Sequence, residues 1–291
     1  MSTFQIRKAE RKQSKIRLGL SGPSGSGKTY TALLIAFGLT NDWSKIAVID
    51  TEQGSADLYE NLGDYNVVQI SAPFEPEKYI AAQKACVDAG MEVIIIDSAS
   101  HVWSGKGGCL DIHETIVKTQ RVANSYTAWA QVTPRFQSFI DNILQTPCHV
   151  ITTLRAKTDY VLAEKNGKQV PQKVGMAAQM RDGFEYELTL AFELDQEHNA
   201  FAGKDRTGLF MGKPAFTPNA DTGKKILEWC NSGKSVEPLN MQEVSIDLTV
   251  ADTLGAVKTI WDSYPNHHNN KEFIAAVTKR KSELESNSVP A

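Results

Sequence analysis

Three kinds of feature are missing from this sequence, and each absence argues against a class of protein. No apolar run approaches the roughly 20 residues that a membrane-spanning helix needs, so we expect no membrane partner. The amino-terminal residues lack the apolar segment of a secretory signal, which favours a cytoplasmic protein. Positive charge is not in excess, because the formal net charge is −3, and a globally basic nucleic-acid binder is not indicated.

Cysteine is sparse as well. The four cysteines are scattered, without a C-x-x-C pair, which favours free buried thiols over a zinc site. What remains is an ordinary globular composition, with 41% hydrophobic and 22% charged residues. A chain of 291 residues can hold one large α/β domain and a small appendage.

The most informative stretch, residues 22–29, reads G-x-x-x-x-G-K-T, the spelling of a phosphate-binding loop. Its glycines let several backbone N–H groups turn toward phosphate oxygens; Lys28 can reach the β- and γ-phosphates, and the Thr29 hydroxyl can ligate Mg²⁺. An apolar strand over 16–20 precedes the loop and an apolar helix over 31–39 follows it, as the motif requires. The expected nucleotide-binding residues are Gly22, Pro23, Ser24, Gly25, Ser26, Gly27, Lys28, Thr29 and Tyr30.

A second nucleotide motif lies on the most apolar strand of the sequence, residues 92–97. Asp97 ends this strand, where an acid can hold Mg²⁺ through water at the carboxyl end of a parallel sheet. Together the two motifs predict that the chain binds ATP with Mg²⁺, with Thr29 and Asp97 on the metal.

Hydrolysis also needs a group that orients and activates water. Many ATPases place a glutamate directly after the metal-binding aspartate, but Ser98 occupies that position here. Glu52 is the alternative, because it follows the apolar strand 45–50, whose carboxyl end opens on the same crevice. A surface glutamate that only caps a turn remains the other interpretation.

The alternation of apolar strands with helices predicts a mostly parallel sheet with helices on both faces. We expect late paired strands over 185–194 and 200–211, and two helices within 109–145, the second beginning at Thr133-Pro134. The chain then divides into a basic arm at 1–15, an ATPase core at 16–231, a linker at 232–247 and a helical pair at 248–291. The arm is either solvated or in contact with nucleic acid or a neighbouring subunit.

Two cations late in the core form a further candidate for catalysis. Lys204 and Arg206 share one face of a strand because they are two residues apart. A cation that one subunit delivers to the γ-phosphate of the next stabilises charge in the transition state. A solvated pair without a partner is the alternative interpretation.

Residues 1–230 resemble the phage-encoded RecA-like ATPases, a family of phage nucleotide-binding proteins that includes minimal single-strand-annealing recombinases. The resemblance rests on four stretches in this order: 20–29, 48–52, 95–98 and 204–208. It implies a RecA-like core, ATP and Mg²⁺, assembly into a ring or filament, and single-stranded DNA as partner. It also implies that Glu52 and Lys28 act in catalysis and that Lys204 and Arg206 act across a subunit interface.

By position in that family, residues 155–181 correspond to the DNA-facing loops. Their cations and a flexible Gly-Met-Ala-Ala stretch suit non-specific contact with the nucleic-acid backbone, around a hairpin turn at Asn166-Gly167. The candidate DNA-binding residues are Arg155, Lys157, Lys165, Lys168, Lys173 and Arg181. Unlike larger recombinases, the sequence shows no separate polymerisation domain and no large DNA-binding domain, which favours annealing over strand exchange.

The leading hypothesis is therefore an oligomeric ATPase that acts on single-stranded DNA in phage recombination or annealing, in the bacterial cytoplasm, with a single-strand DNA-binding protein as a candidate partner. A hexameric helicase-like motor would use the same residues. A nucleotide-gated DNA-binding or assembly protein with little turnover is an alternative from another class. A small-molecule kinase is disfavoured, because no acceptor-pocket motif is evident.

Overall fold

We describe the protein from a computed structural model that covers residues 8–120, 125–165, 168–234, 239–264, 267 and 270–286. The description includes the side chains of these residues except 120, 157–165, 168–177 and 271. The turn predicted at Asn166-Gly167 and the first seven residues of the predicted arm therefore lie outside it, as do the side chains of Lys157, Lys165, Lys168 and Lys173. The chain divides into two compact units, Ser14–Ser232 and a second one formed by the described parts of Met1–Gln13 and Gly233–Ala291.

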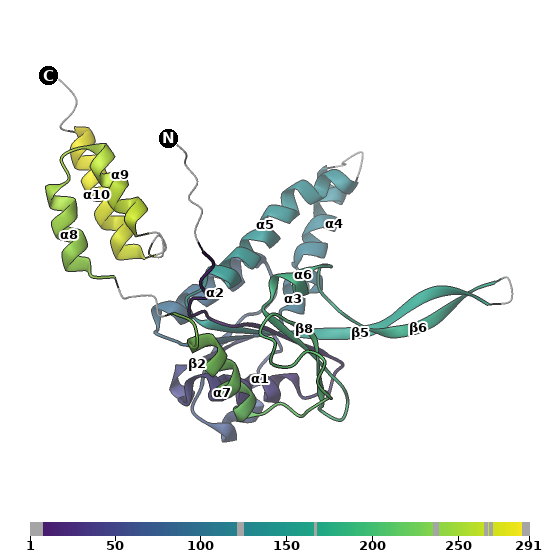
Figure 1. The fold of residues 1–291 in the computed structure, drawn as a ribbon. Coiled ribbons are helices and arrows are strands. Elements are labelled where there is room, and N and C mark those ends of the chain that lie inside the picture. The colour runs from purple at the N-terminus through teal and green to yellow at the C-terminus, as the bar shows by residue number, and fades with distance from the viewer. Residues whose placement is uncertain are drawn as a thin grey trace. The chain divides into compact units, whose positions relative to one another are not determined.

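The larger unit is built on one sheet with the strand order β3-β2-β4-β5-β1-β7-β8 (Figure 1). Strands β1 to β5 and β7 pair in parallel along this path, while β8 runs antiparallel to β7 and β6 pairs antiparallel with β5. This confirms the predicted α/β phosphate-loop core with a mostly parallel sheet and late antiparallel strands. The strands are β1 Arg17–Gly22, β2 Ile46–Asp50, β3 Asn66–Gln69, β4 Val93–Asp97, β5 His149–Lys165, β6 Lys168–Ala178, β7 Leu190–Leu194 and β8 Ala200–Asp205.

Helices cover both faces of the sheet, which explains why β2 and β4 are apolar up to their final aspartates. One face packs against α1 and α7, the other against α2 and α5, and alternate residues of β4 enter the two cores. The helices of this unit are α1 Lys28–Thr40, α2 Pro76–Asp88, α3 Ser100–Ser104, α4 Cys109–Gln120, α5 Ser125–Gln145, α6 Phe184–Glu187 and α7 Ala220–Asn231, with 3₁₀ turns η1 Trp43–Lys45 and η2 Ala56–Leu62.

Close packing of α1 on α7 depends on two glycines. A Cβ atom on Gly38 would lie 1.9 Å from the Ala220 carbonyl oxygen and 2.8 Å from the Gly223 Cα atom. No side chain fits in that space, so the contact that holds the nucleotide-loop helix against the rest of the core requires glycine at position 38.

Two local predictions were wrong. The helix expected to begin at Thr133-Pro134 does not; Pro134 lies inside α5, whose buried face continues through it from Ala128 to Ile143. Burial of this apolar stripe outweighs the hydrogen bond that proline cannot donate. The strand expected from Glu185 begins only at Leu190, because residues 184–187 form the short helix α6.

The carboxyl-terminal unit contains, within its described residues, three helices where the sequence predicted two: α8 Met241–Val250, α9 Leu254–Ser263 and α10 Lys271–Ser286. Helix α8 begins inside the segment predicted as a linker. The Asn240 side chain accepts hydrogen bonds from the N–H groups of Gln242 and Glu243, and Val244 and Leu248 are buried. Among the described helices of both units, none combines the length and apolarity needed to cross a membrane.

Candidate nucleotide-binding site

The phosphate loop joins β1 to α1 and has the backbone of an anion cradle. Gly25 and Gly27 have φ angles of 81° and 80°, values that favour glycine. A Cβ atom on Gly22 would lie 2.6 Å from Ser26 Oγ, so the loop closes tightly on itself. Helix α1 begins without a side-chain cap, and the buried Ser26 hydroxyl has no hydrogen-bond partner among the described atoms. Uncapped N–H groups and an unsatisfied hydroxyl suit a bound phosphate.

Lys28 lies across this loop. Its ammonium group donates to the carbonyl oxygens of Gly22, at 3.0 Å, and Pro23, at 2.7 Å. Burial lowers the pKa of Lys28 below its ordinary value, and the charge of Asp97 opposes that shift. The side chain is therefore held by two carbonyls whose place the oxygens of a triphosphate can take.

Asp97 lies at the end of β4 between two threonine hydroxyls. Thr29 Oγ1 donates to Asp97 Oδ2 at 2.6 Å, and Thr153 Oγ1 of β5 donates to Asp97 Oδ1 at 2.5 Å. Burial raises the pKa of Asp97, while both hydroxyls oppose the rise by stabilising the carboxylate. The predicted metal residues, Thr29 and Asp97, are thus brought together from two elements.

This pair fits Mg²⁺ but not a metal held by protein alone. Within the described ranges no three His, Cys, Asp or Glu side chains are grouped as metal ligands. Mg²⁺ commonly takes one or two protein oxygens and completes its octahedron with phosphate and water. The Thr29 hydroxyl and the Asp97 carboxylate provide such a partial set next to the phosphate loop.

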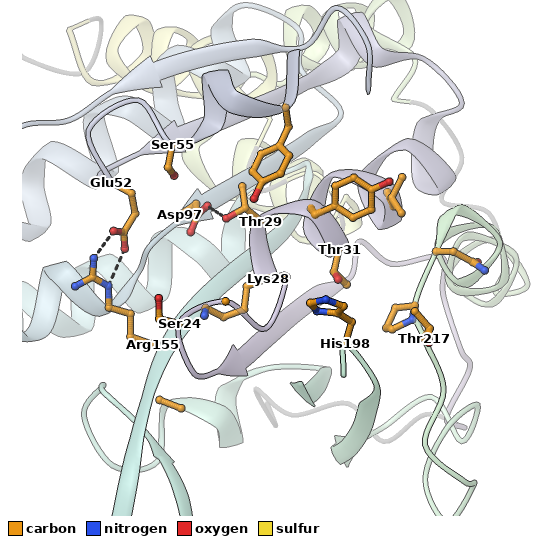
Figure 2. A pocket seen from close by; sticks show the side chains of 18 of the residues that line it. Ser24, Lys28, Thr29, Thr31, Glu52, Ser55, Asp97, Arg155, His198 and Thr217 are labelled. Carbon is orange, nitrogen blue, oxygen red and sulfur yellow. Dashed lines mark hydrogen bonds and ion pairs between the residues drawn. The ribbon is translucent and has the colours of Figure 1, made fainter. Parts of the chain in front are cut away.

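Glu52 is presented by a loop that Asp50 shapes. The buried Asp50 carboxylate accepts the N–H groups of Glu52, at 2.6 Å, and of Gly54, at 2.7 Å. Gln53 and Gly54 in this loop have positive φ angles of 57° and 90°. The turn sends the Glu52 side chain toward the phosphate loop, where its carboxylate meets the Arg155 guanidinium (Figure 2).

These side chains line one cleft of about 990 Å³. Lys28 and Thr29 at the start of α1, Glu52 after β2 and Asp97 at the end of β4 come together in it from three separate segments (Figure 2). The far part of the cleft is more apolar, with the Tyr30 ring edge-on to that of Tyr59 at 5.9 Å between centroids. Also in the lining are Leu34, Thr217, Pro218 and Asn219, which suit the flat, partly apolar base of a nucleotide.

A protein-family model described as an AAA domain matches residues 14–218. The chain belongs to this family. Its core is thus an AAA-type P-loop ATPase domain, the class of fold that binds and hydrolyses nucleotides. No curated protein matches the chain significantly.

The AAA domain also contributes a cleft residue, His198, that no sequence motif predicted. The turn between β7 and β8 lies over the phosphate loop: Gln196 Nε2 donates to the Ser24 carbonyl at 3.4 Å. Next to it, His198 Nδ1 is 3.1 Å from where a Cβ atom on Gly27 would lie. His198 lines the cleft beside the start of α1, although 170 residues separate it from Lys28 and no recognisable spacing links them.

Lys204, Arg206 and Arg181 lie elsewhere in the AAA domain. Lys204 donates to the carbonyls of Glu185, at 2.9 Å, and Tyr186, and Arg206 donates to the Tyr186 carbonyl at 2.9 Å. They meet at α6, outside the lining of the nucleotide cleft. Arg181 lies over the Phe136 ring at 5.6 Å and lines a second cavity of about 570 Å³. Of the DNA-binding candidates, Arg155 faces the nucleotide cleft.

Proposed function

We propose that the protein is an ATP- and Mg²⁺-dependent ATPase of the RecA-like type that acts on single-stranded DNA in phage recombination or annealing, in the bacterial cytoplasm. Lys28 and the loop N–H groups bind the phosphates, Thr29 and Asp97 hold Mg²⁺, and Glu52 orients the attacking water. When bound, Mg²⁺ neutralises phosphate charge as the terminal bond breaks.

The observation that carries hydrolysis is the place of Glu52. Its carboxylate lines the same cleft as Lys28, Thr29 and Asp97, on a loop that Asp50 shapes with two hydrogen bonds. The side chain that accepts the N–H groups of this turn is Asp50, so Glu52 itself does not cap it. A carboxylate there can accept a proton from water as the water attacks.

DNA binding is supported by the long antiparallel pair of β5 and β6. Beyond residue 155, β5 leaves the sheet and pairs with β6 up to Lys165 and Lys168 (Figure 1). The sequence of this hairpin carries the four predicted cations Lys157, Lys165, Lys168 and Lys173. Cations on an extended arm suit contact with a nucleic-acid backbone, which depends on charge more than on base sequence.

Oligomeric action is supported by the position of Lys204 and Arg206. Strand β8 is an edge of the sheet; Lys204 lies on it and Arg206 directly follows it, both outside their own nucleotide cleft. In an assembly they would reach a neighbouring subunit's nucleotide more readily than their own. A helicase-like motor would use the same arrangement, and a single-strand DNA-binding protein remains a candidate partner.

A second candidate function is a nucleotide-gated DNA-binding or assembly protein with little turnover. The observation that favours it is the ion pair of Glu52 with Arg155, which engages both carboxylate oxygens. A glutamate whose two oxygens both face an arginine does not orient water, so such a protein would bind ATP and hydrolyse it slowly.

The deciding measurement is the ATPase rate with and without single-stranded DNA, for the wild type and for Glu52→Gln. We expect stimulation by DNA, and a loss of about 100-fold or more in kcat for the variant with ATP binding retained. The matched control is Glu60→Gln, which makes the same change at an exposed acid on η2 outside the cleft. A wild-type rate that ignores DNA, together with an indifferent Glu52→Gln, would support the second candidate.

A further inference from the structure

The Arg155 guanidinium and the Glu52 carboxylate form a two-point ion pair. Arg155 Nε donates to Glu52 Oε1 at 2.8 Å, and Nη2 donates to Oε2. The His101 ring is the next group, with Nε2 3.9 Å from Glu52 Oε1. Both oxygens of the acid proposed to orient water are therefore engaged by one arginine of the same chain.

Arg155 stands where the core part of β5 ends and the hairpin begins. It is the register partner of Gly22, the first residue of the phosphate loop. Its N–H group donates to Ser100 Oγ at 2.9 Å, and its carbonyl accepts the Gln179 N–H at 2.6 Å. The ladder of the hairpin starts at the next residue, where Ala156 pairs with Ala178.

The root of the hairpin is thus part of the cleft wall. Arg155 and Ala156 on one arm, and Gln179 on the other, all line the nucleotide cleft. A ligand that binds the outer hairpin and twists or tilts β5 and β6 would move the backbone that carries the Arg155 side chain. No separate relay is needed between the hairpin and Glu52.

The connection between the hairpin root and the cleft matters because Arg155 pairs with Glu52. A guanidinium that donates to both oxygens holds the Glu52 carboxylate in place, so while it is paired its oxygens face Arg155 and not the attacking water. Glu52 must also turn at least one oxygen toward the attacking water. The pair is partly exposed, with 46% of the Arg155 side chain and 22% of the Glu52 side chain accessible, so it is weak enough to be released.

We propose that Arg155 is a positioning residue that withholds Glu52 from water, and that single-stranded DNA bound along the β5–β6 hairpin releases Glu52 by shifting the hairpin root. The inference rests on the proposed role of Glu52 in hydrolysis. It assigns Arg155 to control of turnover within its own subunit instead of to direct contact with DNA.

The test is the steady-state ATPase of Arg155→Gln, with and without single-stranded DNA. Without DNA, kcat rises about three- to fivefold, the range expected for loss of a partly exposed ion pair, and KM for ATP stays the same. The factor by which DNA stimulates the rate falls toward one. Arg155→Lys, which keeps the charge but not the two-point contact, gives an intermediate basal rate.

A matched control is available on the outer helices. Arg135 makes the same kind of two-point pair with Glu77, with Nε–Oε1 and Nη2–Oε2 distances of 2.7 Å, outside the cleft lining. Arg135→Gln removes an equivalent ion pair and leaves both the basal and the stimulated rate unchanged. Binding of ATP to each variant, measured directly, verifies that the cleft is folded.

Two results overturn the inference. One is a basal kcat for Arg155→Gln at or below that of the wild type while ATP binding is retained, which would mean that Arg155 assists the reaction or takes no part in it. The other is an undiminished stimulation by DNA. If instead the proposed role of Glu52 in hydrolysis were wrong, the variant Glu52→Gln, alone or combined with Arg155→Gln, would still hydrolyse ATP.

Discussion

Charged groups lie at both ends of the central strand pair, β1 and β5, but the two ends differ in what these groups contact. At the amino ends, Arg17 is only 7% exposed and, within the described residues, donates to the backbone carbonyls of Ile16, Leu144, Thr146 and Cys148. The Leu144 carbonyl belongs to the last turn of α5, and the Thr146 carbonyl directly follows the helix, where a cation also complements the helix dipole. The hydrogen bonds of the Arg17 guanidinium to these carbonyls thus connect strand β1 to the end of helix α5.

At the carboxyl ends the charged groups have partners that a ligand can replace. Lys28 donates to two carbonyls of its own loop, and Arg155 pairs with Glu52 beside the cleft. Asp97 is buried between Thr29 and Thr153 and accepts a hydrogen bond from each hydroxyl. The comparison teaches that charge at the amino ends of these strands stabilises the fold, whereas charge at the carboxyl ends is kept available for chemistry.

The largest effect that tests this contrast is expected from Asp97→Asn. The amide keeps the shape but loses the charge that positions Mg²⁺, so kcat for ATP hydrolysis should fall about 100- to 1,000-fold. Because burial raises the pKa of Asp97, its charge is costly to the fold, and the melting temperature should not decrease. Steady-state kinetics and thermal unfolding measure the two, with the exposed Asp141→Asn on α5 as control. A variant that melts early but hydrolyses ATP normally would reverse the comparison.

Arg17→Leu addresses the opposite end. It leaves several buried carbonyls without a donor, so the free energy of unfolding in urea should drop by about 3 kcal/mol. Arg17→Lys, which cannot reach all of these carbonyls, should lose less. Arg135→Leu is the control, because it breaks an ion pair with Glu77 in which 33% of the arginine side chain is exposed, and should cost below about 1 kcal/mol. Equal losses for Arg17→Leu and Arg135→Leu would remove the distinction between the two ends.

The part of the site that sequence predicts is the part whose residues are neighbours along the chain. The phosphate loop needs its glycines, Lys28 and Thr29 in consecutive order, and Asp97 follows directly from an apolar strand. These patterns also predict the fold, because both faces of the sheet must be covered for such strands to be buried.

What sequence did not predict depends on contacts between distant segments. Arg155 and Glu52 pair across 103 residues, and no local pattern distinguishes an arginine that meets an acid from one that meets DNA. Pro134 is a breaker by local rules, yet tertiary burial of α5 overrides it. Helix α8 was missed because the segment 232–247 as a whole is polar and contains Gly233 and Pro238, although Val244 and Leu248 of the helix are buried.

The smallest predicted effect concerns His149, the other titratable group at the amino ends. His149 is 2% exposed and accepts the Ile16 N–H at Nδ1, at 3.1 Å. Burial, with Lys15 and Arg17 adding repulsion, lowers the pKa of His149 to about 3. As the pH falls below about 6.5, the ordinary pKa of histidine, His149 takes up a proton in the unfolded chain but not in the folded chain. The folded state therefore becomes less stable as the pH falls.

Between pH 6.5 and 5 this group alone should remove about 2 kcal/mol from the free energy of unfolding. His149→Asn keeps an acceptor for the Ile16 N–H but cannot titrate, so its urea-unfolding curves should depend less on pH by that amount. If His149→Asn showed the same pH dependence as the wild type, protonation of His149 would not limit stability. The evidence that charge at the amino ends of the strands governs stability would then come from Arg17 alone.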